Sequence, residues 1–341
     1  MRVMVTGSTG FVGFHTVMAL LEAGHEVRLG VRNPEKMRRV FSPFGVEKLD
    51  FVEGSITDEV AVARALEGCE GVVHAAAMVN LDAKQADFVR RTNVRGTELV
   101  VGGAVERGIE SIVYVSSITA IYTPGLERLN EESPLGRSSN GYGQSKVESE
   151  KYVRGLQESG ASVAITYPTS ILGPDDPGYT EPNRGLAHFL NYMFYETSSG
   201  YQMVDVRDLA AVQVKLLEKG GSGRYVVGGH YLLWKELADL LEELTGQPLF
   251  RVNSPSWVMR LSGDLGDLAK RFVSFELPMT REAVTYATEW VYADSSRLHR
   301  ELGFEFRDLR DTLVDTILWL YRAGYVDRKW ADKLLARQES P

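Results

Sequence analysis

The 341-residue chain is 44% hydrophobic and 25% charged, which is the ordinary composition of a soluble globular protein. It carries 38 basic and 46 acidic residues, a net charge of −8, with no basic block, which argues against a nucleic-acid partner. The single cysteine excludes an intramolecular disulfide, no apolar run reaches membrane-spanning length, and the first strand leaves no room for a signal peptide, so we expect a cytoplasmic protein without a membrane anchor.

Strands and helices are predicted to alternate through the first half of the chain. Short apolar runs predict strands at residues 3–5, 26–31, 49–53, 71–75, 111–115 and 162–167. The segments between them predict helices at residues 14–23, 33–40, 59–66, 82–107 and 142–157. This alternation is typical of a parallel sheet covered on both faces. We therefore predict an α/β fold, a Rossmann-type doubly wound parallel sheet, whose ligands bind at the carboxyl ends of the strands.

The first predicted strand runs directly into a glycine-rich turn that opens a helix. Gly7 allows the tight turn, Gly10 lets the backbone approach a pyrophosphate, and Gly13 lets helix and strand pack closely. The helix N-terminus adds free N–H groups and a partial positive charge. A glycine-rich turn without a ligand is the alternative, but its place between strand and helix favours dinucleotide binding. The predicted contacts also include Thr9, Phe11 and Val12.

The end of the second strand indicates which dinucleotide binds. An acidic residue there would bind the 2′-hydroxyl of NAD, and none is present. Arg32 occupies this neighbourhood instead, with Arg28 and Lys36 close by in the sequence. A guanidinium pairs well with a phosphate, so NADP is favoured over NAD. A solvated basic turn is the alternative, and Glu35 adds an opposing charge.

Small or polar residues follow the third and fourth strands. Ser55 and Ile56 come where an adenine edge would lie. His74 is followed by Ala75, Ala76 and Ala77, whose small side chains would let a cofactor lie against the sheet. His74 itself is expected to be a core or wall residue. The remaining histidines show no ligand spacing, so no metal site is predicted.

Three side chains of a proton-transfer site follow the fifth strand. The strand ends at Ser116 and Ser117, and Tyr142 and Lys146 come later, one helical turn apart. A tyrosine hydroxyl normally titrates near ~10, and a neighbouring ammonium and an oxidised nicotinamide would lower that pKa. Tyr142 could then protonate an alkoxide as hydride reaches a carbonyl carbon. Ser117 would hydrogen-bond the same oxygen, and Lys146 would also hold the ribose hydroxyls.

Five motifs in this order resemble the extended branch of the short-chain dehydrogenase/reductase superfamily, over nearly the whole chain. They are residues 6–13 (TGSTGFVG), 74–77 (HAAA), 93–97 (NVRGT), 114–117 (YVSS) and 142–146 (YGQSK). The resemblance implies Ser117, Tyr142 and Lys146 as the catalytic triad. It implies that Asn93 supports the sheet and the cofactor site, and that Pro168, Thr169 and Ser170 flank the nicotinamide. The helices at 82–107 and 142–157 resemble those that the family uses for a two-fold homodimer, although their outer faces could equally be solvated.

Within this branch the chain looks most like the dihydroflavonol-reductase and 3β-hydroxysteroid-dehydrogenase relatives, through residues 27–34 and 204–210. It departs from nucleotide-sugar epimerases and dehydratases at two places. Ser170 replaces the asparagine that helps to hold the nucleotide-sugar, and residues 199–203 lack the usual Arg-Asp-Phe. Ser55 also replaces an acid that the family often has after the third strand, which puts the adenine contact there in doubt.

The second half of the chain breaks the alternation and is expected to form a smaller, mostly C-terminal substrate-binding domain. Residues 174–200 are predicted to be irregular, with helices at 207–218, 234–245 and 309–322 and a strand at 225–227. The helix at 309–322 is expected to pack back on the sheet. Met193, Phe194, Tyr201 and Trp257 favour an apolar or aromatic ligand, although the apolar stripe that begins at Trp257 is more typical of a core. The predicted units are 1–169 with 204–227 for NADP, 170–203 with 228–305 for the substrate, and C-terminal helices at 306–341.

Three functions are compatible with these residues. The leading interpretation is an NADP(H)-dependent oxidoreductase that reduces a ketone or aldehyde of an apolar or aromatic small molecule, or oxidises the alcohol, with Tyr142 as general acid/base. The alternative is a nucleotide-sugar epimerase or dehydratase that keeps NAD tightly bound. A dinucleotide-sensing scaffold ranks last, because it would tolerate loss of Tyr142 and Lys146, and both are intact.

Overall fold

The computed structural model describes residues 1–339, apart from 47, 81–82, 139, 254–283 and 286–287. Its main sheet has seven parallel strands in the order β10-β6-β5-β4-β1-β2-β3. The strands are β1 (Arg2–Thr6), β2 (Glu26–Val31), β3 (Asp50–Glu53), β4 (Gly71–His74), β5 (Ser111–Val115), β6 (Val163–Pro168) and β10 (Gly223–Val227). The order reverses beside β1, as in a doubly wound sheet, so the predicted fold class is confirmed.

Helices cover both faces of this sheet. They are α1 (Phe11–Glu22), α2 (Pro34–Phe41), α3 (Glu59–Leu66), α4 (Ala86–Thr97), α5 (Gly103–Glu106), α6 (Gly141–Glu158) and α8 (Val206–Lys219). One core cluster joins α1, α2 and α8 to the sheet, and a second joins α3, α5 and α6 to its other face. Single turns stand at η1 (Ser42–Phe44), η2 (Ala83–Gln85) and η4 (Ile118–Ala120).

The single helix predicted over residues 82–107 is interrupted in the structure. A π-helical segment, η3 (Glu98–Gly102), separates α4 from α5. A π segment widens the helix locally. Gly102 lies in it, where a β-carbon would come within 2.2 Å of the Tyr152 hydroxyl oxygen of α6, so α6 approaches the backbone closely at this point.

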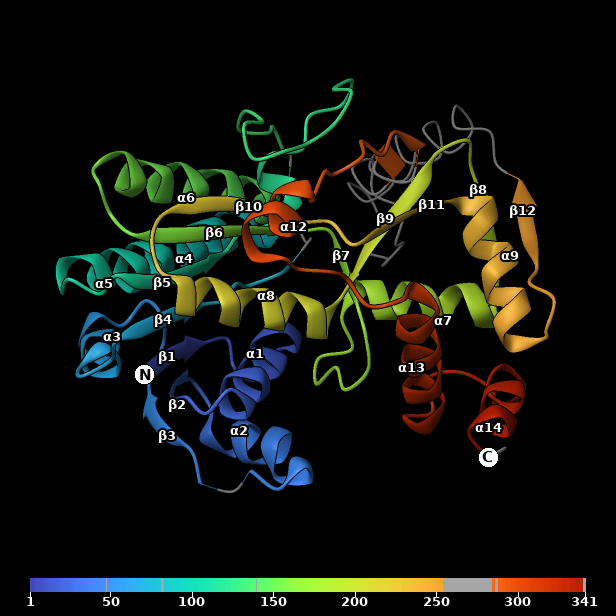
Figure 1. Cartoon of the computed structure of the whole chain (residues 1–341), viewed down its shortest axis with the longest axis horizontal. Helices are drawn as coiled ribbons and strands as arrows, with labels where there is room; N and C mark the ends of the chain where they lie inside the picture. Colours follow the sequence, from blue (N-terminus) through green and yellow to red (C-terminus); the bar gives the residue numbers. More distant parts are fainter. Residues whose placement is uncertain (47, 81–82, 139, 254–283, 286–287, 340–341) are drawn as a thin grey trace.

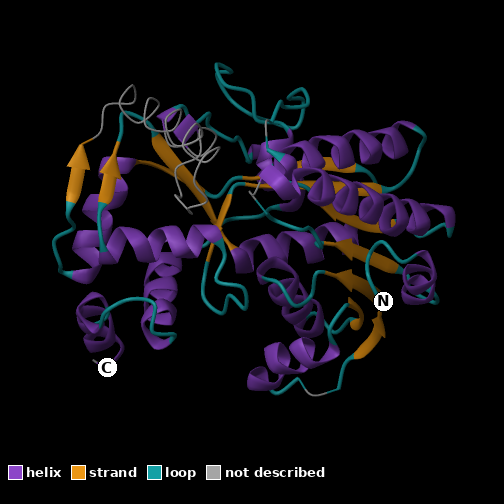
Figure 2. Cartoon of the chain, turned by 180° about the vertical axis from the view of Figure 1, so that it is seen from behind, coloured by secondary structure: helices purple, strands orange, loops and turns teal. Residues whose placement is uncertain are grey.

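A second lobe lies beyond the carboxyl ends of the main strands, and the C-terminus belongs to it (Figure 1). Its two small sheets have the orders β11-β9-β7 and β12-β8 and stand apart from the main sheet (Figure 2). Its strands are β7 (Ser170–Leu172), β8 (Phe194–Glu196), β9 (Gly200–Asp205), β11 (His230–Leu233) and β12 (Arg251–Asn253). Its helices are α7 (Glu181–Asn191), α9 (Trp234–Thr245), α13 (Leu309–Arg322), η5 (Arg328–Trp330) and α14 (Asp332–Glu339), whereas α12 (Ser296–Leu302) packs on β10.

Two expectations for this half were wrong. Residues 174–200 are not irregular, since they contain α7 and β8. One face of α7 is buried through Leu186, Ala187 and Leu190, which have helical spacing. The proline in the first turn and the surrounding aromatic residues make this spacing hard to recognise in the sequence. Helix α13 packs against α7, α9 and β7 of the second lobe and not on the main sheet. The stripe that begins at Trp257 lies outside the described residues.

Candidate active site

The glycine turn between β1 and α1 has the close packing that a diphosphate cradle needs. Gly7 has a φ of +73°, and a β-carbon there would lie 2.7 Å from the Ala76 nitrogen. A β-carbon at Gly13 would lie only 2.2 Å from the carbonyl oxygen of Gly7. Gly10 is the N-cap of α1 and provides no side-chain cap, so the first N–H groups of the helix are left for a ligand.

The remaining residues predicted for this turn differ in exposure. Thr9 and Val12 are half-buried, whereas Phe11 is buried and meets the His15 ring edge-on at 5.4 Å. Phe11 can therefore contribute its backbone, but its side chain belongs to the core. The residues present fit a bound diphosphate through main-chain groups.

The ends of β1 and β4 are tied together beside this turn. The Thr6 hydroxyl oxygen accepts from the Ala76 N–H at 3.3 Å and lies 2.8 Å from His74 Nδ1. Burial, with the nearby Lys146 charge, lowers the pKa of His74 to about 3. His74 is thus a neutral core residue, as predicted, and Ala75, Ala76 and Ala77 follow it half-buried at the sheet edge.

Asn93 of α4 connects this edge to α6. Its amide oxygen accepts from the Met78 N–H at 2.7 Å, and its amide nitrogen donates to the Met78 carbonyl at 3.0 Å and to Ser145 Oγ at 2.9 Å. The segment after the alanines is therefore held against the helix that carries Tyr142 and Lys146. A buried amide with all of these partners is well satisfied.

Ser117, Tyr142 and Lys146 meet at the carboxyl end of β5. Lys146 Nζ donates to the Val115 carbonyl at 2.9 Å and lies 5.9 Å from the centre of the Tyr142 ring. Ser117 follows β5, and its hydroxyl accepts from the Thr119 hydroxyl at 2.9 Å. Asn140 caps α6 by accepting from the Gly143 N–H at 2.7 Å, which fixes the start of the helix that presents Tyr142.

The charge states at this site differ in part from the sequence prediction. Burial raises the pKa of Tyr142, and a hydrogen bond with Ser117 opposes this shift. The pKa of Tyr142 is therefore raised and not lowered as predicted, while Lys146 Nζ lies 5.9 Å from the ring centre and donates to the Val115 carbonyl. Burial also lowers the pKa of Lys146 to about 8, and Glu150 opposes that shift.

The basic residues after β2 do not act as one group. Arg32 is exposed and Lys36 is half-buried near the start of α2, where Asn33 accepts from the Lys36 N–H at 2.9 Å. Arg28 points elsewhere, pairing with Asp50 at 2.8 Å and donating to the Glu67 carbonyl at 2.5 Å. Arg28 is therefore removed from the predicted phosphate neighbourhood, and Arg32 and Lys36 remain.

The residues predicted for the adenine and nicotinamide ends are largely engaged with neighbours. The hydroxyls of Ser55 and Thr57 lie 2.9 Å apart, and Ile56 packs over Gly96 of α4. Pro168 ends β6, and Thr169 Oγ1 donates to the Gly228 carbonyl at 2.8 Å.

Ser170 begins β7, and its side chain hydrogen-bonds Tyr201 of β9. The Tyr201 ring stacks on Trp234 with centroids 5.0 Å apart. Met193 is half-buried, whereas Phe194 is fully buried in the second-lobe core, so its predicted role toward a ligand was wrong.

Two residues near the triad were not predicted. Thr119, two residues after Ser117, donates a hydrogen bond to the Ser117 hydroxyl. In the sequence, only the Ser-x-Thr spacing of a local turn could have indicated this contact. Glu150 is buried one turn beyond Lys146, and a glutamate at that spacing is ordinarily read as part of a solvated helix face.

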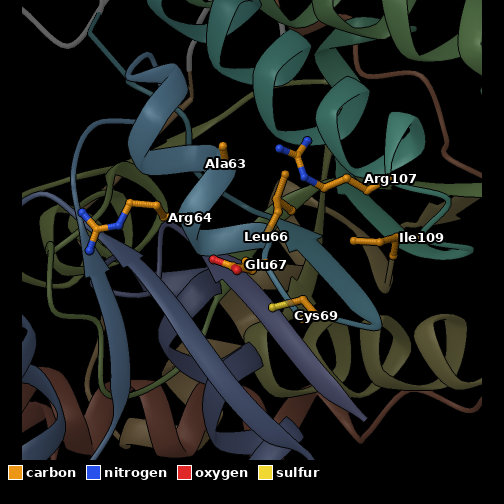
Figure 3. Close-up of a pocket in the computed structure, with 8 residues that line it drawn as sticks. Ala63, Arg64, Leu66, Glu67, Cys69, Arg107 and Ile109 are labelled. Atoms are coloured by element: carbon orange, nitrogen blue, oxygen red, sulfur yellow. The ribbon is translucent and has the colours of Figure 1, made fainter.

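A separate hollow lies at the opposite edge of the main sheet. Its volume is about 460 Å³, and Leu66, Cys69, Arg107 and Ile109 line it with four neighbours (Figure 3). Cys69 and Ile109 precede β4 and β5, so this hollow is at the amino ends of the strands, away from the triad. Burial raises the pKa of the Cys69 thiol, which disfavours a reactive thiolate.

The described residues provide neither a cluster of metal ligands nor a membrane-spanning helix. They hold no group of three or more histidine, cysteine, aspartate or glutamate side chains placed to bind a metal ion. Within the same residues, none of the helices combines the length and apolar character that crossing a bilayer requires.

A doubly wound sheet with a glycine turn at its switch point defines a Rossmann-type protein. The model of the NAD dependent epimerase/dehydratase family matches residues 3–228, and the chain belongs to this family, the extended short-chain dehydrogenases/reductases.

Named relatives place the chain further within this family. A protein of Synechocystis sp. named "Putative dihydroflavonol 4-reductase" is 30% identical over 336 residues, covering 94% of this chain and 95% of the relative. The crystal structure of gox2253 superimposes with a TM-score of 0.80 at 27% identity, covering 96% and 99% of the two chains. UDP-glucose 4-epimerase from Bifidobacterium longum, solved with NAD+ and UDP, shares the fold, with a TM-score of 0.72 at 20% identity over 95% and 99% of the chains.

Proposed function

We propose that this protein is an NADP(H)-dependent oxidoreductase that reduces a ketone or aldehyde of an apolar or aromatic small molecule, or oxidises the corresponding alcohol. The observation that carries the proposal is the meeting of Ser117, Tyr142 and Lys146 at the carboxyl edge of the sheet, beside the glycine turn. The similarity to a relative named as a dihydroflavonol reductase supports an aromatic carbonyl substrate.

The residues that would hold the dinucleotide come from three elements. Gly7, Gly10 and Gly13 with the start of α1 would bind the diphosphate, since the turn is closely packed and the helix is uncapped by a side chain. Arg32 and Lys36 would bind the 2′-phosphate that distinguishes NADP. Lys146 would hold the ribose, and Pro168, Thr169 and Ser170 would flank the nicotinamide.

When bound, the reduced nicotinamide supplies a hydride to the carbonyl carbon. Tyr142 then donates its hydroxyl proton to the carbonyl oxygen, and in the reverse direction it removes the alcohol proton. The raised pKa of Tyr142 keeps the phenol protonated and ready to act as the acid in reduction. Ser117 hydrogen-bonds the same oxygen, and its own orientation is set by Thr119. The positive charge of Lys146 stabilises the tyrosinate that remains.

Two contacts favour this reaction over chemistry on a nucleotide-sugar. The Ser170 side chain, at the position where the epimerases use an asparagine, is bonded to Tyr201. Tyr201 stacks on Trp234, so an aromatic pair stands beside the proposed nicotinamide position. The structural likeness to UDP-glucose 4-epimerase keeps an epimerase or dehydratase with tightly bound NAD as the second candidate.

The experiment that tests the proposal follows NADPH consumption with a panel of aromatic and aliphatic ketones and aldehydes, with NADH in parallel. We expect at least one aromatic carbonyl to be reduced, with NADPH preferred. A protein that retains NAD through purification and consumes no added NADPH with any carbonyl compound would instead favour the epimerase candidate.

A homodimer and a cytoplasmic location are part of this proposal. Helices α4 and α6 pack on each other, and Phe88 on α4 is 51% exposed, as an interface residue would be in the free chain. Light scattering of the purified protein should give twice the mass of one chain, and the mass of a single chain would contradict the proposed dimer. The single cysteine, Cys69, is free and suits a reducing compartment such as the cytoplasm.

A further inference from the structure

Four polar side chains form a stripe along the face of α6 that packs on the sheet. Tyr142, Lys146, Glu150 and Arg154 are spaced four residues apart, which places them above one another on one helical face. Lys146 is 6% exposed, and Glu150 is fully buried. Glu150 is therefore a carboxyl group in the protein interior, one turn behind the proposed catalytic lysine.

The contacts of Glu150 satisfy one of its oxygens and leave the other unpaired. Oε1 accepts from Arg154 Nε at 2.8 Å and from the Tyr167 hydroxyl, and Arg154 Nη2 donates to the Tyr167 oxygen at 3.1 Å. Oε2 is buried and has no hydrogen-bond partner within the part of the chain that the structure describes. Such an oxygen is costly to bury, so it calls for an explanation beyond packing.

Among the residues that the structure describes, one anion acts on the charge of Lys146. Its Nζ lies 5.7 Å from the ring of Tyr114 on β5 and 5.9 Å from the ring of Tyr142. His74 of β4 is neutral, since its pKa is lowered to about 3. Burial lowers the pKa of Lys146 to about 8, and the Glu150 charge is what opposes this shift. Arg154 is one turn farther along the stripe and is paired to Glu150 itself.

We propose that Glu150 is a positioning residue, whose buried negative charge holds the Lys146 side chain in its protonated, cationic state beneath Tyr142. Without this carboxylate, the ammonium would be buried among two tyrosine rings and a backbone carbonyl with no anion on its own helix face. A neutral lysine could neither stabilise a tyrosinate nor attract it electrostatically. The effect of Glu150 on turnover rests on the proposed function, whereas its effect on the charge of Lys146 does not.

The direct test is the titration of Lys146 by nuclear magnetic resonance in protein made with isotope-labelled lysine. The Lys146 signal is assigned by its loss in Lys146→Arg. In Glu150→Gln, which keeps the size of the side chain, we expect the Lys146 midpoint to fall by at least about one pH unit. Glu148→Gln is the matched control, because Glu148 is on the same helix but is 44% exposed and pairs with Arg90. A Lys146 midpoint that is the same in Glu150→Gln as in the wild type would overturn the proposal.

A double variant keeps the test decisive if Glu150→Gln does not fold. Glu150→Gln with Arg154→Gln removes both members of the buried pair and leaves no unpaired charge. The Lys146 midpoint should again fall, and an unchanged midpoint would again refute the proposal. Glu150→Asp keeps the charge and should return the midpoint most of the way to the wild-type value.

Turnover provides a second readout that a merely structural role would not move. In the reduction direction, the basic limb of the kcat/KM profile should shift to lower pH in Glu150→Gln by the same interval as the Lys146 midpoint, with wild-type behaviour in Glu148→Gln. If the midpoint falls but no carbonyl compound is reduced by the wild type, the proposed function fails and the inference about Lys146 stands. If the wild type reduces carbonyls and the Lys146 midpoint does not fall in Glu150→Gln, the inference about Lys146 fails and the proposed function stands.

Discussion

Replacement of Gly13 by alanine tests the diphosphate cradle with a single added methyl group. The new β-carbon would lie 2.2 Å from the Gly7 carbonyl oxygen, 2.5 Å from the Gly7 carbonyl carbon and 2.8 Å from the Ser8 nitrogen. All three are main-chain atoms of the turn, so α1 or the turn must move. Overpacking of this kind costs about 1–3 kcal/mol of unfolding free energy. The same displacement disturbs the N–H groups aimed at the diphosphate, so NADPH affinity should fall at least about tenfold, which corresponds to about 1.4 kcal/mol.

Thermal unfolding and fluorescence titration with NADPH would measure both effects. Gly155→Ala is the matched control, because Gly155 lies inside α6 and a β-carbon there would meet no described atom within 4 Å. That variant should bind NADPH normally and gain up to about 1 kcal/mol, since alanine is the better helix former. If Gly13→Ala bound NADPH with wild-type affinity, the turn would not be the diphosphate site.

Three further predictions concern charge. Arg32→Ala should weaken NADPH binding by about 1.5–3 kcal/mol and leave NADH binding nearly unchanged in parallel titrations, and equal losses for both would remove Arg32 from the 2′-phosphate site. Carbonyl reduction by the wild type should decline as pH rises through about 8, the pKa to which burial lowers Lys146, and a profile flat through that region would show that the charge of Lys146 is not needed. Burial lowers the pKa of His15 to about 4, so the unfolded chain binds the proton more tightly and the folded state loses stability as pH falls from about 6.5. Between neutral pH and about 5, denaturant unfolding should show a loss of stability that is about 2 kcal/mol smaller in His15→Gln than in the wild type, and an equal loss in the two proteins would contradict the assignment.

The strands of the main sheet could be predicted closely because each is a short apolar run bounded by turn residues. The predicted bounds at β2 and β5 coincide with the observed Glu26–Val31 and Ser111–Val115. The glycine turn could be placed for the same reason, since its conformation depends on local residues. Helix α7 was not predicted, because the proline in its first turn and its aromatic neighbours are typical of a loop. In the structure, the helix is stabilised by one face that packs into the core of the second lobe.

The parts of the site that depend on distant contacts could not be predicted. Arg28 looked like a partner of Arg32, but the register of β2 and β3 places it opposite Asp50, and the two side chains pair. Glu150 was not predicted for the site, because only the packing of α6 against β6 buries it beside Tyr167. Tyr201 was expected near the ligand, but its contacts with Ser170 and Trp234 could not be predicted. They depend on the pairing of β7 and β11 with β9 and on the start of α9 directly after β11, which the sequence pattern does not encode.

The measurement that tests the central claim most directly compares wild type with Tyr142→Phe in two assays on the same protein samples. The first follows NADPH consumption with a carbonyl compound that the wild type reduces, and the second follows NADPH binding by fluorescence. We predict that Tyr142→Phe loses at least about a hundredfold in kcat, as expected for removal of a general acid, while NADPH affinity stays close to that of the wild type. Turnover that survives in Tyr142→Phe would contradict the assignment of Tyr142 as the proton donor.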